Sequence, residues 1–112
     1  MSHGEFIVDD VVTGESGATT VIGRCGDEPI RVGQIFDAVY RYKPRRYPDQ
    51  LGDPPVREVE NASCLRVVCI HAYEQSLPLL GQGMTGSLVV EGEGLDRVAP
   101  GWVLGHADMV LA

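Results

Sequence analysis

Cys69 and His71 are the residues of this sequence whose types and spacing come nearest to nucleophilic chemistry. They lie two positions apart in an apolar segment, so a β-strand would place both side chains on one face, where they could touch. A thiol beside an imidazole is the pairing that activates a cysteine nucleophile. The sequence signals neither an orienting acid nor an oxyanion hole beside them. We therefore interpret them as a packed or half-exposed pair, and we predict no catalytic residues.

The other cysteines and the paired acids do not form a recognisable site. Cys25 and Cys64 are not part of the Cys-x-x-Cys pattern that a zinc site with further ligands would need. Asp9 and Asp10 are adjacent, so on a strand they would point to opposite faces and could not work as a facing catalytic pair. We predict no metal site and no cofactor.

A cluster of basic and aromatic residues is the most informative local feature. Its members, called the basic cluster below, are Arg41, Tyr42, Lys43, Arg45, Arg46 and Tyr47. They include four of the 9 basic residues in a chain whose net charge is −7. Arginines interleaved with tyrosines offer charge-assisted hydrogen bonds beside stacking surfaces. Two interpretations stay open: a contact site for nucleic acid or an acidic protein surface, and an intramolecular clamp onto the chain's own carboxylates.

Length and composition exclude several classes of protein. The chain has 112 residues, of which 44% are hydrophobic and 22% charged, as in one soluble globular domain and unlike a disordered tail. A general nucleic-acid coat would be basic overall. A helix that spans a bilayer needs about 18 apolar residues, and no apolar run in this sequence approaches that length. The odd number of cysteines and a start without a secretory pattern predict a reduced, cytoplasmic protein.

The elements that would position these residues are short strands separated by glycine and proline turns. We predict strands over residues 5–12, 18–25, 30–32, 34–42, 58–73, 85–91 and 102–104, and one helical turn over 95–99. Residues 34–42 also show helical spacing of apolar residues, but their strand-like neighbours favour a strand. Residues 43–57 are rich in proline, which indicates a loop. The pattern predicts a single all-β domain over 1–112, a small barrel or sandwich, with a Pro-rich basic loop insertion at 43–57.

The order of these segments resembles the β-barrel second domain of translational GTPases, such as elongation factor Tu and initiation factor two. Five stretches carry the resemblance: Phe-Ile-Val-Asp-Asp-Val at 6–11, Thr-Thr-Val-Ile-Gly-Arg at 19–24, Ile-Arg-Val-Gly-Gln at 30–34, the glycine-rich stretch at 80–86, and Val-Ala-Pro-Gly-Trp-Val-Leu at 98–104. Together they cover nearly the whole chain.

The resemblance implies a small closed six-stranded Greek-key β-barrel of the translation-factor second-domain type, without the GTPase domain. That family's barrel holds the aminoacyl end of tRNA or docks on the ribosome, and the matching pocket positions are Asp9, Asp10 and Thr19. The sequence contains no Gly-x-x-x-x-Gly-Lys-Ser/Thr phosphate loop, so neither GTP hydrolysis nor GTP binding is expected.

We therefore expect a non-enzymatic, stand-alone module with a binding or regulatory role, whose partner is a protein, or tRNA or rRNA, and not a membrane. One alternative is an RNA-contacting or ribosome-contacting module that uses the basic cluster. Another is an immunity-like or antitoxin-like protein that binds and neutralises a partner. Small size, acidity and the missing catalytic set suit this last class.

Overall fold

The chain folds into β-strands joined by tight turns. The computed structural model describes residues 4–14, 18–43 and 56–107. Its long strands are β1 (Phe6–Thr13), β2 (Thr19–Cys25), β4 (Ile35–Tyr42), β5 (Arg57–Ala72) and β8 (Thr85–Glu93). Its short elements are β3 (Ile30–Arg31), β6 (Gln75–Ser76), β7 (Leu79–Leu80), β9 (Val103–Gly105) and one 3-10 turn, η1 (Leu95–Arg97).

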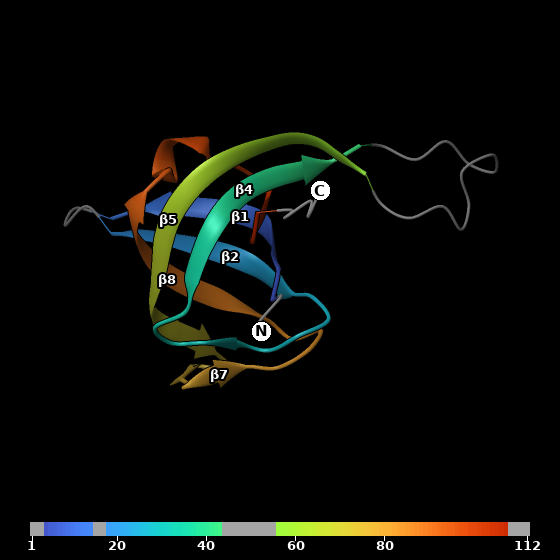
Figure 1. Cartoon of the computed structure of the whole chain (residues 1–112). Helices are drawn as coiled ribbons and strands as arrows, with labels where there is room; N and C mark the ends of the chain where they lie inside the picture. Colours follow the sequence, from blue (N-terminus) through green and yellow to red (C-terminus); the bar gives the residue numbers. More distant parts are fainter. Residues whose placement is uncertain (1–3, 15–17, 44–55, 108–112) are drawn as a thin grey trace.

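Six of these strands close into an antiparallel barrel (Figure 1). Around the barrel the order is β4, β9, β1, β2, β8 and β5, and β5 pairs again with β4 to complete the ring. β5 makes closure possible because it is long: its first half pairs with β4 and its second half with β8. The predicted all-β, closed six-stranded barrel is confirmed.

The alternation of side chains across each strand fills the barrel with apolar groups. Along β2, alternate residues from Thr19 to Cys25 are buried, as expected for a strand with one face inward. The interior contains, among others, Phe6, Val21, Phe36, Leu65, Ile70, Leu88 and Leu104, all 0% exposed. Each such side chain contributes about 1.5–3 kcal/mol to the free energy of unfolding through removal from water. The interior is therefore a packed core.

A second, smaller apolar cluster lies on the outer face of β4 and β9. It consists of Ala38, Tyr40 and Val103, with Ile7 and Tyr42 packed against it. A bulge between Phe36 and Ala38 shifts the alternation of β4. Val39 consequently points into the barrel while its neighbours Ala38 and Tyr40 are buried on the outside.

The observed elements agree with most of the sequence-based boundaries. Residues 35–42 form a strand, so the choice of strand over helix was right. The helical turn predicted over 95–99 is a 3-10 turn at Leu95–Arg97. The loop predicted over 43–57 is one residue too long at its end, because Arg57 already pairs with Tyr42 in the sheet. Residues 44–55 of that loop lie outside the described residues.

Candidate functional site

The described part of the basic cluster lies at the end of β4, where Arg41 is held by two contacts. Its Nε lies 3.2 Å from Oε2 of Glu58 on β5. Its guanidinium carbon lies 5.2 Å from the centre of the Trp102 ring, which is a cation–π distance. The Arg41 side chain nevertheless keeps 46% of its surface exposed. Arg41 is therefore ordered by its own chain and still faces solvent.

Lys43, the next cation of the basic cluster, is exposed. Its backbone N–H donates to the Val56 carbonyl across 2.7 Å, which extends the β4–β5 ladder by one hydrogen bond. The remaining members, Arg45, Arg46 and Tyr47, lie outside the described residues.

Tyr42 belongs to a polar network that the sequence did not reveal. Its hydroxyl donates to Oε2 of Glu5 across 2.5 Å, and the hydroxyl of Tyr40 donates to the same oxygen. The Arg57 guanidinium lies 3.6 Å from the centre of the Tyr40 ring. Burial, and then the Glu5 carboxylate, raise the pKa of both tyrosines above the ordinary value. Tyr42 is thus turned toward the chain's own N-terminal segment.

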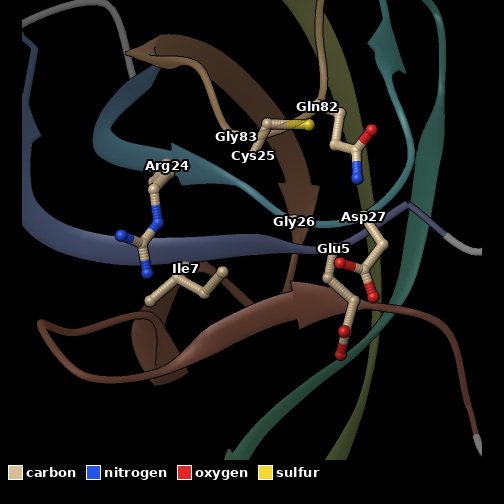
Figure 2. A pocket seen from close by; sticks show the side chains of 8 residues that line it. All are labelled: Glu5, Ile7, Arg24, Cys25, Gly26, Asp27, Gln82 and Gly83. Atoms are coloured by element: carbon tan, nitrogen blue, oxygen red, sulfur yellow. The ribbon is translucent and has the colours of Figure 1, made fainter.

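An open cavity of about 460 Å³ lies beside this network, next to the turn that follows β2. Figure 2 shows its lining: the Glu5 and Asp27 carboxylates and the Gln82 amide gather on one side, and Arg24 and Ile7 lie on the other. Cys25 also lines the cavity, and its thiol donates to the Glu28 carbonyl across 2.9 Å. Burial raises the pKa of that thiol, which makes Cys25 a structural residue.

Cys69 and His71 touch, as their spacing of two residues on one strand allows. Sγ lies 3.1 Å from Nε2 of the imidazole on the outer face of β5. The structure adds a third member, because Ser76 Oγ lies 3.3 Å from the other ring nitrogen, Nδ1. No group of three or more histidine, cysteine or acidic residues that could hold a metal ion occurs within residues 4–14, 18–43 and 56–107.

The comparisons with known proteins identify the fold. Neither the family models nor the curated proteins match this chain. Among solved structures, translation elongation factor SelB from Methanococcus maripaludis in its apo form matches with a TM-score of 0.66 and 15% sequence identity. The same factor in complex with the GTP analogue GppNHp gives the same values. The fold is that of a translation-factor β-barrel domain. In both comparisons the match covers 96% of this chain and 20% of the SelB chain, so this chain spans about a fifth of SelB's length.

Of the three positions that the family resemblance assigned to a pocket, Thr19 lies apart from the two adjacent aspartates. A bulge between Val8 and Asp10 interrupts β1, and Asp9 and Asp10 are both exposed. Thr19 is 5% exposed at the start of β2. Asp10 pairs with Ile22, three residues along β2 from Thr19, which separates the two positions by about 10 Å along the strand. The described residues thus place Thr19 in the barrel wall and the two carboxylates at its surface.

The described residues include no helix long and apolar enough to cross a membrane.

Proposed function

We propose that this chain is a non-enzymatic, translation-factor-like β-barrel that acts as a binding or regulatory module through its outer surface. The packed interior supports a surface role, because the inward positions of the barrel are filled by apolar side chains packed against one another.

The single observation that carries the proposal is the position of Arg41. Its contacts with Glu58 and Trp102 order a long cationic side chain near the end of β4, and the rest of the basic cluster follows in the sequence. A side chain that is ordered before binding loses less conformational entropy when a partner arrives. The exposed Lys43 follows it in the sequence. We infer that this end of the barrel contacts an acidic patch on a protein, because the strongly acidic remainder of the chain repels nucleic acid, charged at every phosphate, more than a protein surface of mixed charge.

RNA or the ribosome is the second candidate partner. The observation that favours it is the stacking of Arg41 on Trp102, because a cation and a ring at one place also suit nucleobases and phosphates. The similarity of the fold to a translation elongation factor agrees with this candidate.

The cytoplasm is the compartment that we propose. Cys25, Cys64 and Cys69 are all free thiols, which suits a reducing environment.

The experiment that tests the proposal is affinity capture from a cell extract. The triple variant Lys43→Ala, Arg45→Ala and Arg46→Ala removes three charges of the basic cluster and leaves the ordered Arg41 in place. We expect this variant to capture less of the partner than the unaltered chain does. The difference between the two should be largest at low salt, where screening of charges is weakest. Capture that survives nuclease treatment identifies a protein partner, whereas capture abolished by nuclease identifies RNA.

A charge-matched control makes the capture experiment specific. The variant Arg24→Ala, Arg31→Ala and Arg66→Ala also removes three positive charges, but from β2, β3 and β5. It should keep the partner. Equal loss of capture in both triple variants, or unchanged capture in both, would contradict a contact at the basic cluster.

A further inference from the structure

The outer face of β5 carries a nucleophile and a base, and the paired strand β6 carries a group that contacts the base. Cys69, which is partly exposed, and the exposed His71 both point outward, because the intervening Ile70 and the following Ala72 are buried. Sγ and Nε2 are 3.1 Å apart, and Ser76 Oγ lies 3.3 Å from Nδ1. A nucleophile within hydrogen-bond reach of a base that a third group orients is the arrangement of an activated nucleophile.

The Ser76 hydroxyl can accept a hydrogen bond as well as donate one, so it is compatible with the tautomer that the thiol needs. When Nδ1 carries the ring proton and donates it to Ser76 Oγ, Nε2 keeps its lone pair and faces the Cys69 thiol. The imidazole can then accept the thiol proton directly. Ser76 is therefore a positioning residue, which acts through His71.

A strained turn sets Ser76 opposite His71. The β5–β6 hairpin pairs His71 with Ser76 and Ala72 with Gln75, which leaves Tyr73 and Glu74 as a two-residue loop. Both loop residues have positive φ, 54° at Tyr73 and 63° at Glu74, where glycine or asparagine is usual. The Tyr73 side chain is 76% exposed, so burial of its ring does not explain the conformation. The two-residue turn sets the register in which Ser76 lies opposite His71 and its hydroxyl reaches the imidazole.

Cys69 differs from the other two cysteines of the chain in its surroundings. Cys25 is buried, and its thiol donates to a carbonyl. Cys64 is exposed, and the His71 imidazole contacts Cys69. Cys64 and Cys69 are five residues apart along one strand, or about 16 Å, too far for an internal disulfide. A partner thiol for Cys69 would have to come from another molecule.

Space for a small molecule lies beside this group. His71 lines an open concavity of about 310 Å³ together with Ile22, Tyr73, Glu74 and Thr85, among others. The His71 imidazole both lines this concavity and contacts the Cys69 thiol. The Glu74 carboxylate at its edge favours a cationic molecule.

We propose that Cys69 is a thiol-modification site that forms a mixed disulfide with low-molecular-weight disulfides. The Cys69 proton passes to Nε2 of His71 while Sγ attacks one sulfur of the small disulfide. The S–S bond of that disulfide breaks, and the departing thiolate takes the proton from the imidazolium. The products are a mixed disulfide at Cys69 and one free small thiol, so the small disulfide supplies the oxidising equivalents and no further oxidant is needed.

The test measures the rate of modification at each cysteine of the full chain with cystamine, a small cationic disulfide. Peptide mass spectrometry after digestion reports the cysteamine adduct at each position. We expect Cys69 to react at least tenfold faster than Cys64, with Cys25 unmodified in the folded protein. Cys69 reacting no faster than Cys64, or a disulfide-linked pair of chains as the main product, would overturn the proposal.

Three variants separate the roles of the neighbours. His71→Gln should slow Cys69 at least tenfold and leave the rate at Cys64 unchanged. Ser76→Ala should slow Cys69 severalfold, and Ser76→Thr, which keeps a hydroxyl, should restore the rate. Circular dichroism and thermal melting confirm that each variant is folded. Equal slowing at both cysteines, or a Cys69 rate that does not depend on His71, would show that the imidazole is not the base.

Discussion

Gly23 of β2 and Gly86 of β8 lie directly opposite each other in the barrel wall. A Cβ atom on Gly23 would collide with the Ile7 carbonyl oxygen of β1. A Cβ atom on Gly86 would lie 2.9 Å from the His71 carbonyl oxygen of β5, closer than real Cβ contacts. The two glycines therefore mark a line along which β1, β2, β8 and β5 approach one another closely, as a tightly coiled small barrel requires.

Gly23→Ala should destabilise the barrel strongly. Its methyl group would meet backbone, which cannot rotate away as a side chain can, so we expect a loss of about 2 kcal/mol or more in the free energy of unfolding. Urea unfolding measures the change. Gly26→Ala is the control, because its Cβ would lie 3.4 Å from the nearest atom, the Glu5 carbonyl oxygen, and should cost little. Equal stability of the two variants would contradict the close approach.

The Tyr40–Tyr42–Glu5 network predicts a loss of stability at alkaline pH. The pKa of both phenols is raised in the folded state by burial and by Glu5, while the pKa of an unfolded tyrosine is about 10. The folded state therefore holds these protons more tightly. The stability contribution is complete below about pH 10 and falls as the pH rises above it.

The pH dependence is checked by urea unfolding between about pH 8 and pH 11. The double variant Tyr40→Phe and Tyr42→Phe should lose stability less steeply above about pH 10 than the unaltered chain. Tyr73→Phe, which changes an exposed tyrosine, should keep the original slope. If stability fell as steeply with pH in the double variant as in the unaltered chain, the network would not be what retains the two phenol protons.

Arg41 and Trp102 can be followed by fluorescence, since Trp102 is the single tryptophan of the chain. Arg41→Ala removes the cation from the ring and should shift the tryptophan emission. The loss of stability should stay below about 1 kcal/mol, because the ion pair with Glu58 is half exposed. Arg31→Ala, on β3, should leave the emission unchanged. A fall of several degrees in melting temperature on Arg41→Ala would favour the intramolecular clamp instead.

Relieving the strained hairpin should stabilise the protein. Replacing Tyr73 and Glu74 by Asn and Gly supplies residues that adopt positive φ readily. We expect a gain of about 1–2 kcal/mol in the free energy of unfolding, measured by urea unfolding. Replacement by two alanines is the control and should bring no such gain. A loss of stability with Asn–Gly would mean that the Tyr73 and Glu74 side chains contribute more than their backbone strain costs.

GTP should not bind to this chain. The sequence contains no phosphate-binding loop of the Gly-x-x-x-x-Gly-Lys-Ser/Thr kind. Isothermal titration calorimetry with GTP and Mg²⁺ is expected to show no heat of binding. A dissociation constant of about 1 mM or tighter, which corresponds to about −4 kcal/mol, would contradict the expectation.

Local information in the sequence determined the strands, and the resemblance to the translation-factor second domain added the closed barrel. Alternating apolar residues in segments such as 19–25 are buried alternately, and glycine and proline mark the ends of these segments. The contact of Cys69 with His71 was predictable for the same reason, because positions two apart on one strand share a face. Such properties depend on neighbours along the chain.

Tertiary structure alone decided which distant residues meet. Arg41 and Trp102 are far apart in the sequence, as are Glu5 and the tyrosines that donate to it, and nothing in their local patterns links them. Ser76 reaches His71 only through the register of a two-residue turn. Closing six twisted strands into a ring sets these registers, and bulges shift the alternation where the backbone must bend. Local sequence specifies which face of a strand is apolar, but the closed ring determines which side chains come together across it.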